Sequence, residues 1–204
     1  MPASPSQPAR SRRSPTAAAT AYTQLLDAAE ALFYQEGVRA VGVEAVVERA
    51  GVNKMSLYRQ FASKDELVLA YLERKKANYF RRFEAAAARL PGDARAQLLQ
   101  LVDDLAQRAR QPTYRGCPFI NVAVEFPDAA HPARVSVAEN KQELMQRLVA
   151  LSTEAGARDP QLLADGLALV LEGIYAASQT YRAEHSPIGG APQVVRMMID
   201  AACA

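Results

Sequence analysis

The chain has 204 residues and a formal net charge of +2, and its 50% hydrophobic and 23% charged residues are typical of a folded protein rather than a disordered one. It contains 40 alanines and 20 leucines but only 20 valines and isoleucines together, which favours helix over sheet. Its apolar runs are shorter than the roughly 20 residues that span a bilayer, and two cysteines and two histidines offer little for a disulfide framework, a metal site or a histidine-based catalytic centre.

These features predict a cytoplasmic protein with no metal, no cofactor and no membrane partner. An enzyme on a helical scaffold is the weakest alternative, because the chain has no nucleophile–base set, no phosphate-binding loop and no H-E-x-x-H motif.

Charge is divided unevenly along the chain. Residues 1–90 hold 14 basic and 9 acidic side chains, giving +5, whereas residues 91–204 hold 10 and 13, giving −3. A basic first part beside a mildly acidic second part indicates a polyanion-binding module joined to something else. Residues 1–14, rich in Pro, Ser and Ala and with three arginines but no acid, predict a disordered basic tail. That tail is either a solvated terminus or an arm that touches phosphate.

Glycine, proline and capping residues divide the rest of the chain into about nine helices, and no alternating strand pattern interrupts them. We therefore expect an all-α fold. The fourth helix opens at a capping box over residues 63–66 and is long, about 40 Å at 1.5 Å per residue. The expected elements are 15–36, 43–50, 54–61, 64–90, 93–110, 114–126, 132–155, 159–185 and 192–203.

The second and third helices are short, and the three-residue turn 51–53 between them contains a glycine, which makes them a helix-turn-helix candidate. Leu57 and Phe61 lie four residues apart and should face the core. Lys54, Met55, Tyr58 and Arg59 then form the outer face, suited to contact with phosphates and base edges. The alternative is an αα-corner with ordinary surface charges.

The stretch from Leu25 to Leu72 reads LLDAAEALFYQEGVRAVGVEAVVERAGVNKMSLYRQFASKDELVLAYL. It resembles the N-terminal DNA-binding domain of the TetR family of transcriptional regulators, most specifically at residues 50–52, 56–58 and 63–67. The resemblance implies a helix-turn-helix domain over residues 15–65 and a ligand-binding and dimerisation domain over 66–204. It implies a homodimeric regulator of a double-stranded DNA operator, a repressor released by a small molecule. The runner-up is a helical ligand-binding or interaction protein without DNA binding.

The resemblance also assigns roles by position. Lys54 and Met55 match positions that read bases, and Arg59 matches a variable position that can reach bases or phosphates. The positions that hold phosphates are matched by Ser56, Tyr58, Gln60 and Lys64.

Two positions of the second helix depart from the family pattern. Many members begin this helix with Thr or Ser, whereas here Gly42 and Val43 stand there, so one phosphate-contacting hydroxyl is missing. Glu44 lies where an outward residue meets the groove. An acid there either accepts a hydrogen bond from a cytosine amine or repels the DNA backbone.

Apolar stripes on the last two long helices are expected to form the dimer interface, as the resemblance implies; the alternative is that they are monomer core. The interface residues expected on this basis are Leu163, Leu167, Val170, Ile174, Val195, Met198 and Ile199.

The segment 115–126 mixes apolar bulk with two polar side chains four residues apart. One reading is a pocket wall for a largely apolar effector, with Tyr175 and Gln179 of the 159–185 helix also lining the pocket. The other reading is a helix whose polar edge faces solvent or the next helix. The residues of the wall are Phe119, Val122 and Phe126 for shape, and Asn121 and Glu125 for polarity.

Cys117 also belongs to this expected pocket, at the N-terminal end of the segment and near Arg115. Both features lower the pKa of a thiol, so a thiol-based sensor of electrophiles or oxidants is an alternative function. A lone cysteine is more often a small packed hydrophobe.

Overall fold

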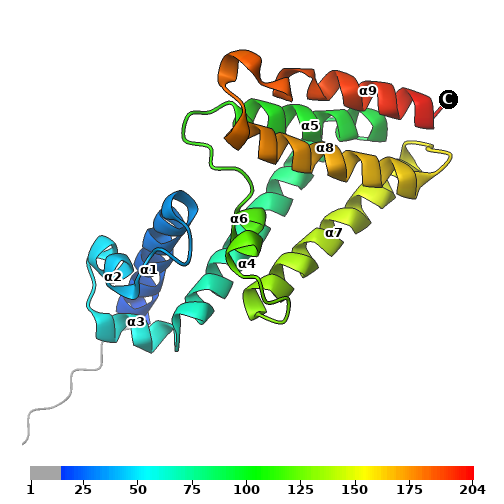
Figure 1. Ribbon diagram of the computed structural model, residues 1–204. Helices are drawn as coiled ribbons and strands as arrows, with labels where there is room; N and C mark the ends of the chain where they lie inside the picture. Colours follow the sequence, from blue (N-terminus) through cyan, green and yellow to red (C-terminus); the bar gives the residue numbers. More distant parts are fainter. Residues whose placement is uncertain (1–14) are drawn as a thin grey trace, which may run out of the picture.

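The computed structural model describes residues 15–204, which form nine α-helices and two short 3₁₀ turns with no strand among them (Figure 1). The all-α prediction is confirmed, and the expected basic tail of residues 1–14 lies outside the described residues. None of the described helices has the length and apolarity to cross a bilayer. The helices are α1 Pro15–Glu36, α2 Val43–Ala50, α3 Lys54–Gln60, α4 Lys64–Ala88, α5 Ala94–Ala109, α6 Pro118–Glu125, α7 Pro132–Glu154, α8 Pro160–Thr180 and α9 Ala191–Ala202.

The first three helices pack against one another around a small apolar core. α2 ends at Gly51, whose positive φ of 66° closes the turn in the left-handed region that glycine adopts without strain. Asn53 then begins α3, and its side chain accepts a hydrogen bond from the backbone N–H of Ser56. Leu57 and Phe61 are buried, so α3 turns its opposite side outward.

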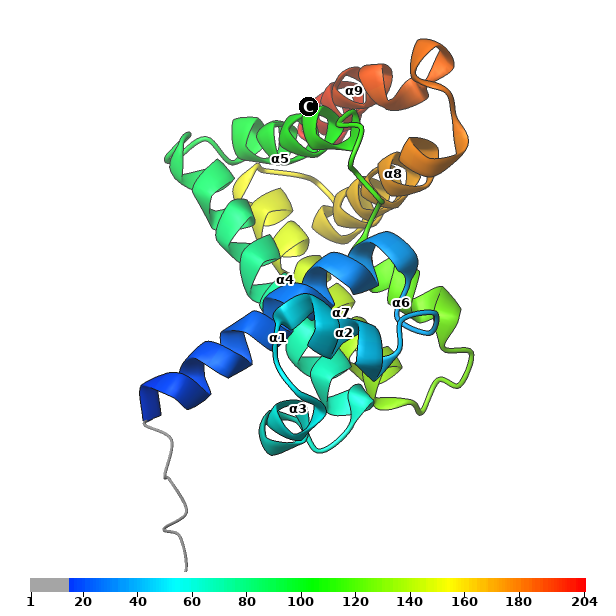
Figure 2. The ribbon, with the colours of Figure 1, turned by 90° about the vertical axis from the view of Figure 1, so that its left-hand side faces the viewer.

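The long helix α4 belongs to both halves of the molecule. Ser63 caps it as predicted, its Oγ accepting from the N–H of Glu66 at 3.1 Å. Its first turns contact α1, where the ring of Tyr71 meets Phe33 edge to face, while its later turns contact α5 and α7. Figure 2 shows α1 crossing in front of α4, with the later helices beyond.

The second half is a bundle in which α5, α8 and α9 lie side by side, at the top of Figure 1. α7 packs along α8 and also contacts α4 and α5. α6 is short and sits between α7 and α4, close to the first three helices.

Two expected boundaries were wrong. α8 ends at Thr180 rather than near residue 185, because Tyr181 is extended and the 3₁₀ turns Ala183–His185 and Pro187–Gly190 follow. The segment 114–126 is helical only from Pro118, since Gly116 has a φ of 77° and proline favours the first helical position.

Candidate functional site

The outer face of α3 is the first part of the site. Met55 is 63% exposed, and Lys54, Tyr58 and Arg59 are exposed beside it, whereas Leu57 and Phe61 are inside the core as predicted. A short helix therefore presents two cations, an aromatic hydroxyl and a thioether to solvent. This combination suits contact with phosphates and base edges.

Ser56 does not belong to that face. Its side chain is only 5% exposed, and its hydroxyl lies 3.0 Å from Oδ1 of Asn53. The expected phosphate contact through Ser56 is therefore wrong, because the hydroxyl already helps to fix the N-terminal turn of α3. Gln60 is half-buried at the end of α3, and Lys64 is half-buried in the first turn of α4.

α2 contributes an acid rather than a hydroxyl to the outer face. The Lys54 ammonium donates to the Glu44 carboxylate, which lowers the pKa of Glu44 and raises the pKa of Lys54. Both side chains are more than half exposed, so this ion pair is weak and is easily exchanged for a phosphate. Val43 is half-buried and packs on the core, which leaves it little surface for DNA.

At the C-terminal end of α6, Glu125 contacts the turn between α1 and α2 rather than a pocket or α7. The Glu125 carboxylate accepts hydrogen bonds from the backbone N–H of Val38 at 3.1 Å and of Arg39 at 2.6 Å. Gly37 allows this approach: its φ is 93°, and a Cβ there would lie 3.1 Å from Oε1 of Glu125. The predicted pocket role of Glu125 is wrong, because this carboxylate binds the turn between α1 and α2.

The other residues expected on the pocket wall have different roles. Asn121 donates from its amide to the carbonyl of Arg115 at 2.8 Å, and the ring of Phe126 stacks on His131. Phe119 and Val122 are buried in the core. None of these side chains lines the cavity described below, so the segment predicted as a pocket wall serves as a structural connection.

Cys117 is buried, only 5% exposed, and burial raises the pKa of its thiol. The expected lowering of the pKa was wrong because loss of water outweighs the opposing effects of Lys141 and of the first N–H groups of α6. The thiol therefore stays protonated and enclosed, which argues against a sensor at this position.

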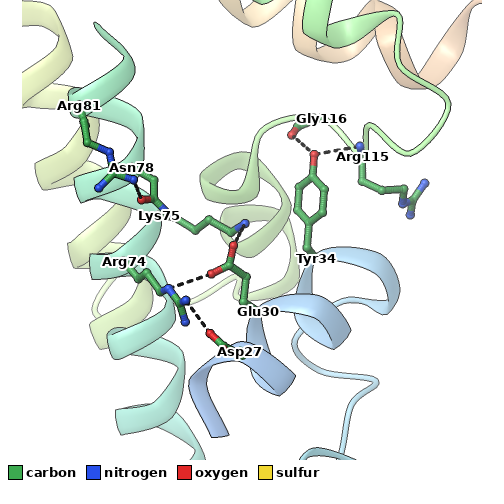
Figure 3. A network of polar contacts seen from close by, with 9 residues as sticks. All are labelled: Asp27, Glu30, Tyr34, Arg74, Lys75, Asn78, Arg81, Arg115 and Gly116. Carbon is green, nitrogen blue, oxygen red and sulfur yellow. Dashed lines mark hydrogen bonds and ion pairs between the residues drawn. The ribbon is translucent and has the colours of Figure 1, made fainter. Parts of the chain in front are cut away.

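A second connection joins α1 to the loop before α6. The Tyr34 hydroxyl donates to the carbonyl of Gly116 at 3.1 Å and accepts from the N–H of Arg115 at 2.9 Å (Figure 3). Gln179 of α8 holds the same loop, since its amide nitrogen donates to the carbonyl of Tyr114 and its oxygen accepts from Arg115. The expected pocket role of Gln179 is therefore replaced by a contact between α8 and this loop.

Ion pairs between α1 and α4 lie beside this connection. Glu30 accepts from Lys75 at 2.8 Å and pairs with Arg74, which also reaches Asp27 (Figure 3). The Lys75 ammonium sits 4.8 Å from the centre of the Tyr34 ring. α1 is thus tied to α4 on one side and to the loop before α6 on the other.

A cavity opens between α4, α5 and α8 in the second half. Its free space is about 30 Å³, close to the volume of one water molecule in the liquid, so a larger guest enters only if side chains move. Tyr175 is one of the residues that line it. The lining is completed by Tyr79, Arg82, Phe83, Ala86, Leu101, Asp104, Leu105, Arg108 and Leu171.

Most residues expected at the dimer interface are inside the single chain. Burial in the monomer leaves these side chains no surface to offer a partner, so the prediction was wrong for Leu163, Leu167, Ile174, Val195 and Ile199. Val170 and Met198 are half-buried and border an outward apolar face of α8 and α9. We call this surface the α8/α9 face; its exposed residues are Leu162, Leu169, Gly173, Val194 and Met197.

Comparisons with known proteins match both halves of the chain. The description "Bacterial regulatory proteins, tetR family" matches residues 25–71, and "Tetracyclin repressor-like, C-terminal domain" matches residues 94–187. The crystal structure of SCO4454, a TetR-family regulator from Streptomyces coelicolor, superposes with a TM-score of 0.86 at 28% identity and covers 91% of this chain and 97% of that one. A TetR-type regulator from Streptomyces avermitilis gives a TM-score of 0.77 at 34% identity, covering 89% and 97%.

Two curated relatives match over shorter stretches. The transcriptional repressor KstR of Rhodococcus jostii is 34% identical over 127 residues, 62% of this chain and 57% of KstR. The transcriptional activator FasR of Mycolicibacterium smegmatis is 47% identical over 55 residues, 27% of this chain and 25% of FasR. The chain thus matches between a quarter and just over half of these two proteins.

Proposed function

Because the chain belongs to the TetR family of transcriptional regulators, we propose that it is a homodimeric, sequence-specific DNA-binding repressor that a small molecule releases from its operator. KstR is named a repressor, and its match to this chain extends beyond the helix-turn-helix segment. This match supports repression rather than activation. The site of action is the cytoplasm, where bacterial DNA is found. Regulation, not catalysis, is the activity proposed.

The single observation that carries the proposal is the outward face of α3. Lys54, Tyr58 and Arg59 stand exposed on a short helix, while the capped turn before it and the buried Leu57 fix its direction. A rigid helix with exposed cations can enter the major groove and contact phosphates beside it. Binding needs no large rearrangement of the side chains that hold α3 in place.

The α8/α9 face supports a dimer. Leu169 is 73% exposed on it, and a Cβ at Gly173 would meet nothing within 4 Å, so a second helix can approach closely there. Exposed apolar surface of this kind is costly in water and is covered by a partner subunit in our proposal. Pairing of two chains sets two α3 helices about 34–36 Å apart, one turn of DNA.

The contacts between the two halves supply a route for the effector's influence. Tyr175 lines the cavity, and its backbone carbonyl lies close to Gly116, in the loop that Tyr34 of α1 holds. Glu125 connects the same region to the turn before α2. A ligand that enlarges the cavity can shift this loop. If the ligand binds more tightly to an arrangement in which the two α3 helices no longer match the spacing of the DNA grooves, it weakens DNA binding.

A salt titration tests DNA binding. A duplex selected from a random pool is labelled, and its affinity for the purified full-length chain is measured by fluorescence anisotropy at several salt concentrations. We expect the logarithm of affinity to fall linearly with the logarithm of salt concentration, as bound phosphates regain counterions. Recovery of no preferred duplex, or affinity that ignores salt, would contradict the proposal.

A further inference from the structure

Two arginines at the cavity have no partner within the described chain. Arg82 of α4 and Arg108 of α5 both line the cavity, and neither guanidinium group makes a hydrogen bond or ion pair with any described residue. The pKa of Arg82 is lowered, first by partial burial and next by the nearby charge of Arg108. Two like charges that face one cavity repel each other, and an anion between them would remove that cost.

The carboxylate of the cavity does not neutralise them. Asp104 lines the same space, but one of its oxygens accepts from Arg89 and the other accepts from Gln100. The Arg89–Asp104 pair is therefore electrically balanced, and the charges of Arg82 and Arg108 remain. The cavity wall therefore carries an excess of positive charge.

Two tyrosines complete the polar part of the wall. The hydroxyls of Tyr79 and Tyr175 are hydrogen-bond partners, and burial raises the pKa of Tyr79 to about 12 and that of Tyr175 well above its usual value. Both hydroxyls therefore remain protonated at neutral pH, and because one donates to the other, one O–H is left to donate to a guest. The rest of the wall is apolar, with Phe83 and Leu171 among its members.

We propose that the effector is an organic carboxylate, whose head group lies between Arg82 and Arg108 and whose apolar body replaces contacts among the hydrophobic wall residues. A planar carboxylate matches the planar guanidinium fork, which can hold both of its oxygens. The sequence had predicted a largely apolar effector, and the unpaired arginines add a charged head group to that expectation. This inference rests on the proposed function, because it names the class of ligand that the regulator responds to.

Thermal unfolding of the full-length protein tests the inference without DNA. The probes are linear carboxylates of four to twelve carbons together with benzoate and cinnamate, each measured beside its uncharged primary amide. We expect at least one carboxylate to raise the melting temperature and to bind at least tenfold more tightly than its amide. The variants R82Q and R108Q should each weaken that carboxylate at least tenfold and leave the affinity of the amide unchanged.

R81Q is the matched control, since Arg81 is next to Arg82 in the sequence but does not line the cavity and instead contacts Asn78 (Figure 3). It should bind the carboxylate as the unmodified protein does. R82Q and R108Q lose no ion pair and relieve the repulsion between the two arginines, so in the absence of probe both should fold with a melting temperature no lower than that of the unmodified protein. The inference is overturned if no carboxylate binds, if the amides bind equally well, or if R81Q weakens binding as much as R82Q.

Affinity for DNA without probe separates this result from the proposed function. Arg82 lies far along α4 from α3, so R82Q should bind the selected duplex as the unmodified protein does. A protein that binds carboxylates through both arginines but no DNA would refute the regulator and retain the carboxylate site. A protein that binds DNA but no carboxylate would refute the carboxylate site and retain the regulator.

Discussion

The carboxylate of Glu125, the last residue of α6, accepts a hydrogen bond from the backbone N–H of Val38 at 3.1 Å, in the turn that leads from α1 to α2. The N–H of Arg39 donates to the other oxygen of the same carboxylate. One side chain of the second half thus fixes the backbone of the helix-turn-helix half. Any shift of α6 is transmitted directly to the segment that positions α2 and α3.

Replacement of Glu125 with alanine should weaken the coupling between the cavity of the second half and DNA binding by the first half. We expect E125A to lose about 1 to 2 kcal/mol of unfolding free energy, since two backbone donors lose a charged acceptor. The variant should still bind the selected duplex, but a saturating carboxylate should weaken its DNA binding by a smaller factor than it does in the unmodified protein. Anisotropy titrations with and without the most strongly stabilising carboxylate measure that factor.

Glu154 provides the control for this prediction, because it is exposed at the end of α7. E154A should leave both stability and coupling unchanged. An E125A protein with full coupling to the carboxylate would show that the effector's influence travels by another route.

The α8/α9 face should determine whether the chain pairs. Leu169 is 73% exposed on this face, so L169E would place a charge in a desolvated interface and should shift the protein to monomers in sedimentation experiments. The monomer should also bind the selected duplex at least tenfold more weakly. Val124, 77% exposed on α6, gives the comparison, and V124E should remain dimeric. Dimers that persist in L169E would place the interface elsewhere.

Polar side chains at the edge of the outer face of α3 should raise or lower the affinity for DNA of any sequence. K64A and Y58F should weaken binding to selected and unrelated duplexes alike, and K64A should reduce the salt slope by about 1. E44Q should act in the opposite direction, since it releases Lys54 from its ion pair and removes a negative charge near the phosphates. Parallel anisotropy titrations on both duplexes check these signs, and an E44Q protein that binds more weakly would contradict them.

The thiol of Cys117 should be unreactive at neutral pH. Its raised pKa means that the thiolate forms only at a pH above the usual range for a thiol, and its burial also limits access. Alkylation by iodoacetamide, followed by mass spectrometry, should modify the half-buried Cys203 before Cys117 at pH 7. Loss of DNA binding that tracks rapid modification of Cys117, and is absent in C117S, would restore the thiol-sensor alternative.

Sequence reasoning was most successful where the signal is local. Caps at Asn53 and Ser63, the glycine turn at Gly51 and the inward spacing of Leu57 and Phe61 all follow from short-range rules. The same rules do not fix which side of a helix meets another helix. Ser56, for example, has the residue type for a phosphate contact, but its hydroxyl lies against its own cap.

The second half shows why the remaining errors arose. α8 is apolar on two sides, and the more regular stripe, with Leu163 and Leu167, turned out to be monomer core. Leu162 and Leu169, seven residues apart, mark the other side, and apolar residues all round a helix signal burial on both faces. The cavity arginines, Arg82 and Arg108, come together only through packing of α4 on α5, which no spacing along the chain reveals.

Selection of DNA sequences from a random pool, repeated with the unmodified protein, K54A and R59A, tests the central claim most directly. If the exposed face of α3 reads bases in both subunits, the unmodified protein should enrich an inverted repeat with half-sites one helical turn apart. K54A and R59A should change the preferred base at symmetric positions in the two half-sites. An enriched sequence without twofold symmetry, or identical preferences in all three proteins, would contradict the account.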